Sequence, residues 1–267
     1  MKPPLQPNDP GAPRPAPHLW QHVDEIRKRL RSAPRISLLI DFDGTLARIQ
    51  PRPELAFLDV ATRQALARLA QHPGVRIWIV SGRRLAVLRG LASVEGVKCL
   101  GLHGWEGGNH LPLTHARLRA IRHAKDLFQS MLAGIPGVWI EDKGPVFVVH
   151  YRQAGVLDVV KARRIVRRLM TELASHFRML EGKKIWEILP VEISGKGEAA
   201  RLILDRQPAG TLAIYLGDDA TDEDAFRTLP RALTVRVGRA ARTAARYRLK
   251  NPREVREFLQ KIEQALA

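Results

Sequence analysis

The stretch Ser37-Leu-Leu-Ile-Asp41-Phe-Asp43-Gly-Thr-Leu46 decides the fold. A short apolar run that ends at a carboxylate is typical of a buried parallel strand that delivers a polar residue at its carboxyl end. Two carboxylates this close together are costly at a buried strand end unless a cation compensates them. Taken alone, the segment fits a strand capped by an Asp-Gly turn almost equally well.

The same pattern recurs along the chain. Apolar strands are predicted at 75–80, 98–102 and 211–216, and each opens into a polar segment, namely Ser81-Gly-Arg83, His103-Gly-Trp-Glu106 and Gly217-Asp-Asp219. Helical periodicity covers 20–31, 59–71, 84–91 and 197–204. Alternating strands and helices indicate a parallel sheet with helices on both faces, where ligands bind beyond the carboxyl ends of the strands.

The middle of the chain has a different pattern. Helices are predicted at 115–132 and 156–176, with strands at 137–140, 146–151 and 184–189. We therefore expect an α+β cap domain over residues 107–190, inserted into an α/β core of residues 19–106 and 191–267. The proline-rich residues 1–18 are expected to form a disordered leader.

Composition limits the function classes. The formal net charge of +17, from 44 Lys and Arg against 27 Asp and Glu, favours anionic partners. No aromatic-interleaved basic patch is present, so nucleic acid is not expected as the main partner. The sequence has no apolar segment long enough to span a membrane and no secretory signal, and its single cysteine, Cys99, is expected to be buried. These features favour a cytoplasmic protein, which we expect to be a monomer.

The polar strand ends suggest phosphoryl chemistry. Asp41 is a candidate nucleophile, and Asp43 a candidate acid and base. Asp218, with Asp219 and Asp222 close behind, is suited to Mg²⁺, although Glu223 and Asp224 also fit the acidic first turn of a helix. Candidate phosphate ligands are the hydroxyls, backbone amides and ammonium of Thr45, Ser81, Gly82 and Lys196.

Four motifs, Asp41-Phe-Asp-Gly-Thr-Leu, Ser81-Gly-Arg, Lys196-Gly and Gly217-Asp-Asp-Ala-Thr-Asp-Glu-Asp, occur in this order. Together they resemble the haloacid-dehalogenase superfamily of phosphatases. The resemblance implies a Rossmann-like core, a mobile cap of the C2 type, Mg²⁺ and an aspartyl-phosphate intermediate. It also implies the metal ligands Asp41, Asp43 (through its backbone carbonyl) and Asp218, with Asp219 and Asp222 near the metal.

A narrower resemblance, to trehalose-6-phosphate phosphatases, is carried by Gly217–Phe226, His103–Glu106, Glu141-Asp-Lys143-Gly, Val149-His-Tyr-Arg152 and Gly182–Glu187. It implies hydrolysis of trehalose 6-phosphate, with the sugar bound by His103, Glu106, Glu141, Lys143 and Glu187. Leu189 stands where that family usually has a basic residue. This departure leaves open a phosphatase for another sugar phosphate or a phosphoglycerate-type substrate. A basic protein associated with nucleic acid is a third alternative.

Overall fold

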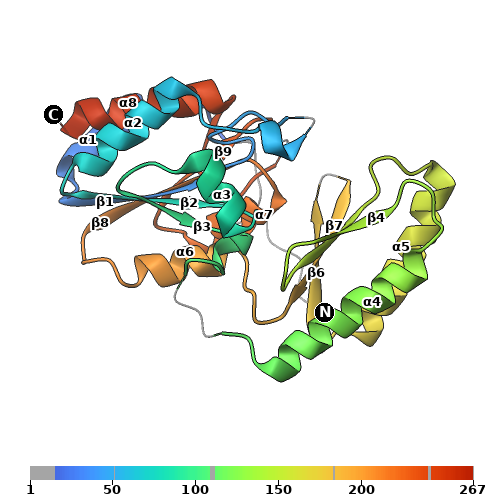
Figure 1. The fold of residues 1–267 in the computed structure, drawn as a ribbon. Coiled ribbons are helices and arrows are strands. Elements are labelled where there is room, and N and C mark those ends of the chain that lie inside the picture. The colour runs from blue at the N-terminus through green and yellow to red at the C-terminus, as the bar shows by residue number, and fades with distance from the viewer. Residues whose placement is uncertain (1–15, 51, 109–111, 183, 240–241, 267) are drawn as a thin grey trace, which may run out of the picture. The chain divides into compact units, whose positions relative to one another are not determined.

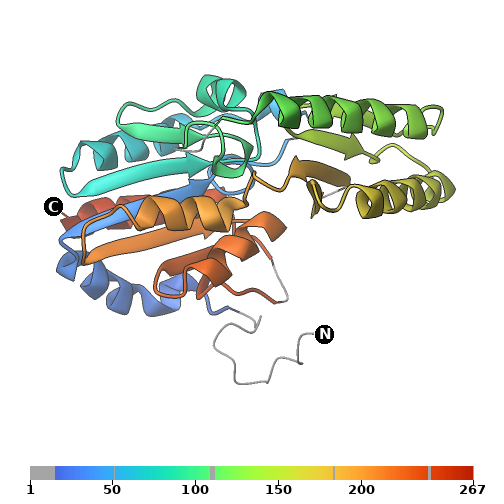
Figure 2. The same ribbon diagram turned by 90° about the horizontal axis from the view of Figure 1, so that it is seen from below.

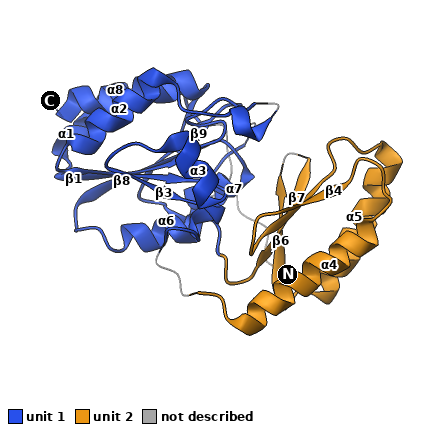
Figure 3. Cartoon of the chain, in the orientation of Figure 1, with its two compact units in different colours: residues 1–108, 194–267 blue, residues 109–193 orange. Residues whose placement is uncertain are grey.

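The computed structural model describes residues 16–266 except 51, 109–111, 183 and 240–241. The chain divides into two compact units, residues 1–108 with 194–267 (unit 1) and residues 109–193 (unit 2), shown in Figure 3. Within the described residues, no helix combines the length and the apolar character needed to cross a membrane.

Unit 1 is built on a parallel sheet with the strand order β10-β9-β8-β1-β2-β3 (Figure 1). Its strands are β1 (Arg35–Asp41), β2 (Val75–Val80), β3 (Val97–Leu100), β8 (Thr211–Gly217), β9 (Leu233–Val237) and β10 (Tyr247–Leu249). Strand β1 lies between β2 and β8, and six of its seven residues are buried. The carboxyl end of β1 is therefore at the middle of the sheet, where ligands bind in such folds.

Helices cover both faces of this sheet. On one face Leu38 and Ile40 pack with α1 (Val23–Ser32), α2 (Val60–Gln71), α3 (Leu85–Ala92) and α8 (Pro252–Leu266). On the other face Leu39 packs with α6 (Lys196–Leu204) and α7 (Ala220–Thr228), which lie along the sheet in Figure 2. The alternation along β1 is that of a strand buried on both sides.

The beginning of the described chain belongs to the fold. Short helix η1 (Leu19–His22) leads into α1. Before it, Ala16 is buried, and the carbonyl of Pro17 accepts a hydrogen bond from the backbone N–H of Arg248 at 2.9 Å. Residues 1–15 of the predicted leader lie outside the described residues. Residues 16–18 contact Arg248 of β10, so the last three residues of the predicted leader, 1–18, belong to the folded unit.

The third predicted strand, 98–102, ends earlier than expected. Leu102 and His103 have φ angles of 45° and 60°, values that no strand residue adopts, and they belong to the short helix η3 (Leu102–Gly104). Another short helix, η2 (Pro53–Leu55), precedes α2. Strand β3 therefore ends at Leu100, and a tight turn carries the chain to Glu106.

Unit 2 has an antiparallel sheet with the order β4-β5-β7-β6. Its elements are α4 (His115–Leu132), β4 (Trp139–Asp142), β5 (Phe147–His150), α5 (Val156–Glu172), β6 (Phe177–Gly182) and β7 (Ile185–Pro190). The expected fold class, a parallel α/β core with an inserted α+β block, is confirmed. The prediction of a helix to residue 176 was wrong: α5 ends at Glu172, and β6, which was not predicted, follows because Phe177 enters the core.

Candidate active site

Asp41 is the last residue of β1 and is buried, with 3% of its surface exposed. Its Oδ1 accepts a hydrogen bond from Lys196 Nζ at 2.6 Å. Its Oδ2 has no hydrogen-bond partner among the described residues, and neither does the buried hydroxyl of Thr45. Buried polar atoms without partners are rare in folded proteins. Asp41 and Thr45 stand four residues apart at and just after the end of β1, so their free oxygens are available to a ligand there.

Lys196 is the buried cation of the site, at the first turn of α6. Its ammonium also donates to Asp222 Oδ1 at 2.9 Å. Burial alone would lower the pKa of Lys196, but the attraction of Asp222 and Asp41 raises it well above its usual value. The lysine is therefore protonated and joins β1, α6 and α7 electrostatically.

Asp222 is fully buried and has a partner for both oxygens. Oδ1 accepts from Lys196 and from the Tyr215 hydroxyl, and Oδ2 accepts from the backbone N–H groups of Asp218 and Asp219 at 2.9 and 3.0 Å. Gly217 is required here, because a Cβ at that position would lie 2.1 Å from Asp222 Cγ. Asp222 thus shapes the loop that carries Asp218.

Asp219 is the N-cap of α7. Its Oδ1 accepts hydrogen bonds from the N–H groups of Thr221 and Asp222, and the Asp219 backbone N–H donates in return to Asp222 Oδ2, which completes a capping box. Burial opposes ionisation, but Lys196 and the Thr221 hydrogen bond lower the pKa of Asp219. Contact of Asp219 or Asp222 with a metal through water stays a prediction.

The charge balance of the site fits a divalent cation. Carboxylate oxygens of Asp41, Asp218 and Asp222 lie within 4.8 Å of one another, whereas Lys196 supplies a single positive charge. Burial and the neighbouring Asp219 and Asp222 raise the pKa of Asp218 to about 7, and burial raises that of Asp41. Because the oxygens of Asp222 already have donors, Asp41 and Asp218 are the side chains best placed to hold Mg²⁺.

Gly44 lets Asp218 approach the end of β1. Its φ of +85° is left-handed, and a Cβ there would lie 2.1 Å from Asp218 Oδ2. We expect Gly44→Ala to lose about 1–2 kcal/mol of stability from backbone strain and at least about tenfold in activity, because Asp218 is displaced. Urea unfolding and phosphatase kinetics measure the two effects.

Gly134→Ala is the matched control for this prediction. Gly134 has a φ of +78°, and a Cβ there would meet no described atom within 4 Å. We expect the same stability loss with unchanged activity. Equal activity in the two variants would contradict the role assigned to Gly44.

Asp43 lies beyond the end of β1 and is held by Arg83. The guanidinium donates from Nε and Nη2 to the two carboxylate oxygens, both at 2.7 Å. It also lies over the Phe42 ring, 5.6 Å from the centroid. Such a bidentate pair fixes the carboxylate more tightly than one bond does. This role of Arg83 was not predicted from the sequence, although its position directly after Ser81-Gly82 was a signal.

The predicted phosphate ligand Ser81 lies at the carboxyl end of β2. It is buried, and its hydroxyl accepts from the Arg83 backbone N–H at 3.2 Å. Its carbonyl accepts from the His103 N–H at 2.8 Å, and a Cβ on Gly82 would lie 2.9 Å from His103 Cε1. Ser81, Gly82 and His103 are therefore brought together, and the next residue after Gly82, Arg83, holds Asp43.

Glu106 has a defined structural role. It accepts hydrogen bonds from Arg84 Nε at 2.8 Å and from the Leu85 backbone N–H at 2.5 Å, at the start of α3. Both oxygens thus have donors within unit 1. Sugar binding by Glu106 stays a prediction, and the observed contacts assign it to the positioning of η3 against α3.

The three predicted sugar ligands of unit 2 lie close together. Glu141 on β4 and Glu187 on β7 both pair with Val148 of β5, on one face of the sheet. Lys143 Nζ lies 3.3 Å from Glu187 Oε1, and His150 Nε2 lies 2.8 Å from Glu141 Oε2. The hydrogen bond from His150 lowers the pKa of Glu141, so it is a charged acceptor at neutral pH.

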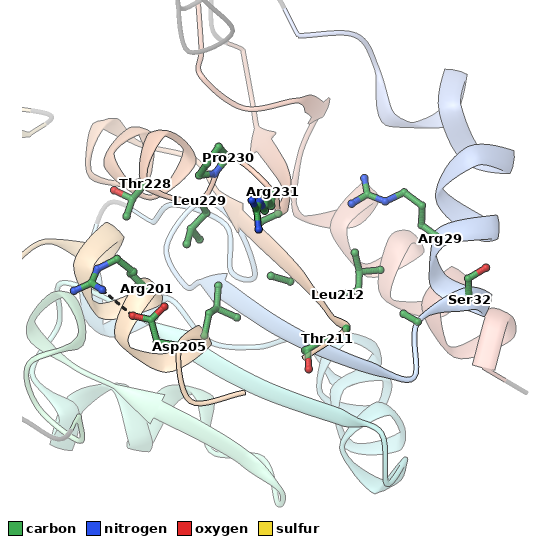
Figure 4. A pocket seen from close by; sticks show the side chains of 15 residues that line it. Arg29, Ser32, Arg201, Asp205, Thr211, Leu212, Thr228, Leu229, Pro230 and Arg231 are labelled. Carbon is green, nitrogen blue, oxygen red and sulfur yellow. Dashed lines mark hydrogen bonds and ion pairs between the residues drawn. The ribbon is translucent and has the colours of Figure 1, made fainter. Parts of the chain in front are cut away.

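A large cavity lies at the other end of β8 and contains none of these residues. It has a volume of about 610 Å³, and Figure 4 shows Arg29, Thr211 and Arg231 on its wall. The last residues of α1, α6 and α7 (Ser32, Leu204 and Thr228) line it. The cavity therefore contains no predicted site residue, although Arg29, Arg201 and Arg231 on its wall supply positive charge against the partial negative charge of the helix ends.

The parallel sheet, the buried aspartate at the end of its central strand and the lysine beside it define a member of the haloacid-dehalogenase superfamily. A haloacid dehalogenase-like hydrolase from Bacteroides thetaiotaomicron shares the fold, with a TM-score of 0.59 at 16% identity over 85% of this chain and 99% of that one. The family model for trehalose-phosphatase matches residues 39–253. The chain belongs to the trehalose-phosphatase family.

Several relatives match nearly the whole chain. The Escherichia coli trehalose-6-phosphate phosphatase is 32% identical over 85% of this chain and 86% of its own length. A bifunctional trehalose-6-phosphate synthase/phosphatase from Thermoproteus tenax is 32% identical over 90% of this chain, which spans 33% of that relative. The C-terminal domain of C. albicans trehalose-6-phosphate phosphatase has a TM-score of 0.77 at 25% identity, over 94% of this chain and 99% of that one.

Proposed function

We propose that this chain hydrolyses trehalose 6-phosphate to trehalose and inorganic phosphate. Membership of the trehalose-phosphatase family supports the substrate. The observation that carries the chemistry is the buried Asp41 carboxylate, with one oxygen held by Lys196 and the other without a partner among the described residues. A carboxylate in this state is oriented and poorly solvated, which suits a nucleophile.

In the first step, an Asp41 oxygen attacks phosphorus, and the bond between phosphorus and the sugar oxygen breaks. Protonated Asp43 gives its proton to that leaving oxygen, so trehalose departs and an aspartyl phosphate remains. In the second step, Asp43 takes a proton from water, whose oxygen attacks phosphorus; the bond between phosphorus and the Asp41 oxygen breaks, which frees phosphate and restores the Asp41 carboxylate. Through its two hydrogen bonds, Arg83 holds the ionised Asp43 carboxylate, which is the form that takes the proton in the second step.

The remaining groups stabilise charge. Lys196, Ser81, Gly82 and Thr45 are proposed to hold the phosphoryl oxygens. Mg²⁺, held by Asp41 and Asp218 with the backbone carbonyl of Asp43, would neutralise negative charge on the transferring group. We further propose that the protein acts as a monomer in the cytoplasm. Its one cysteine, Cys99, is buried and forms no disulfide, which suits a reducing compartment.

Phosphate release from a panel of sugar phosphates, with Mg²⁺ and with a chelator, tests the proposal. We expect trehalose 6-phosphate to have the highest kcat/KM and chelation to abolish turnover. A higher kcat/KM for another sugar phosphate or a phosphoglycerate would contradict the substrate. Full activity in the chelator would contradict the metal.

The carboxylates of unit 2 give a separate prediction about specificity. Glu187→Ala removes an acceptor proposed for sugar hydroxyls, together with the carboxylate that lies 3.3 Å from Lys143 Nζ. We expect kcat/KM for trehalose 6-phosphate to fall about tenfold to a hundredfold, with little change for p-nitrophenyl phosphate. Equal losses on both substrates would show that Glu187 is needed for folding and not for sugar recognition.

A further inference from the structure

Among the described residues of unit 2, helices cover only one face of the sheet. Alternate residues Phe147, Val149, Trp186 and Ile188 pack into the core with α4 and α5, which lie against the same side of the sheet in Figure 1. The strand register places Trp139, Glu141, His150 and Glu187 on the opposite face. The side chains proposed for sugar binding therefore share their face with an aromatic pair.

That pair is a tight parallel stack. The rings of Trp139 on β4 and His150 on β5 lie 3.9 Å apart between centroids, with an interplanar angle of 2°. His150 is in turn held by Glu141 through the 2.8 Å contact at Nε2. The orientation of the indole is thus fixed by a neighbour that is itself anchored to a proposed sugar ligand.

Trp139 is unusual for its exposure. Half of its surface (50%) is accessible. The other Phe, Tyr and Trp residues in the described part of unit 2 are all buried: Phe128, Phe147, Tyr151, Phe177 and Trp186. Strand β4 is an edge strand, and edges are usually protected by charge or proline and not by a large apolar ring. Edge protection therefore does not explain this tryptophan.

We propose that Trp139 is a specificity-determining residue, a platform on which a pyranose ring of the substrate stacks. One face of a pyranose presents C–H groups and is apolar, whereas its rim carries hydroxyls. The indole would take the apolar face, and Glu141, Lys143 and Glu187 would take hydroxyls at the rim. This inference rests on the proposed function, because a disaccharide phosphate is the ligand it requires.

The test compares Trp139→Ala, Trp139→Phe and the native chain on trehalose 6-phosphate and on p-nitrophenyl phosphate. We expect Trp139→Ala to raise KM for the sugar phosphate about tenfold with little change in kcat. Trp139→Phe, which keeps an aromatic surface, should recover most of this loss. Neither variant should change kcat/KM for the simple ester more than about twofold. The control is Leu157→Ala on α5, which truncates a 76% exposed apolar side chain and should change the kinetics of neither substrate.

A binding measurement separates recognition from turnover. Titration with trehalose should change the tryptophan fluorescence of the native chain and leave that of Trp139→Phe unchanged. An unaltered KM for trehalose 6-phosphate in Trp139→Ala, or equal losses on both substrates, would overturn the platform. The proposed function would still stand if the native chain hydrolyses trehalose 6-phosphate. A native chain that cleaves the simple ester and not trehalose 6-phosphate would overturn both.

Discussion

Asp41→Asn is expected to lower kcat/KM for trehalose 6-phosphate by at least about 10⁴-fold, because an amide oxygen cannot attack phosphorus as a carboxylate does. The substitution keeps the shape of the side chain. It also removes a buried carboxylate, and burial raises the pKa of that group. Lys196 keeps Asp222 as a partner. Stability should therefore change little. Steady-state kinetics and urea unfolding of the same preparation measure both quantities.

Asp205→Asn is the matched control for Asp41→Asn. Asp205 is more than half exposed and pairs with Arg201 at 2.7 Å, and its replacement by asparagine should leave activity unchanged. A folded Asp41→Asn chain that retained more than about a tenth of native activity would exclude Asp41 as the nucleophile.

Lys196→Met is expected to cost about 3–5 kcal/mol of stability, in addition to activity, because it leaves the buried carboxylates of Asp41 and Asp222 without their cation. Their pKa values, already raised by burial, would then rise further in the folded chain. A raised folded-state pKa means that the native state binds more protons than the unfolded chain. The variant should therefore be more stable at pH 5 than at pH 8, with stability lost as the pH rises.

Urea unfolding of Lys196→Met at both pH values checks this prediction. The double variant Lys196→Met/Asp222→Asn removes one of the uncompensated charges and should regain part of the stability without regaining activity. A single variant as stable as the native chain at pH 8, or one destabilised equally at both pH values, would contradict the electrostatic role of Lys196.

Much of the core could be predicted because it depends on local pattern. The apolar run before Asp41 and the break at Pro73-Gly74 fix a buried strand and the end of a helix within a residue or two. Strand β6 was missed because Phe177 and Met179 face the core while Arg178 and Leu180 do not, in a run too short to separate from the end of a helix.

The site was predicted less completely because its contacts join distant parts of the chain. Sequence order placed Asp41, Ser81, Lys196 and Asp218 at one sheet edge, but it could not indicate which carboxylate Lys196 would approach. Asp222 has the pattern of a helix first turn, and the structure gives it four donors, one from α6, one from β8 and two from the loop after β8. Tyr215 is one of those donors, and nothing in the sequence of β8 distinguishes it from the other buried residues of that strand.

The central claim is that the phosphoryl group passes through Asp41. Rapid acid quench of the enzyme during turnover of trehalose 6-phosphate labelled with ³²P, followed by digestion and peptide mapping, tests it most directly. The account predicts label on the peptide that contains Asp41 and none on the Asp41→Asn chain. Label bound to the Asp41→Asn chain, or a full single turnover of native enzyme with no label bound, would contradict it.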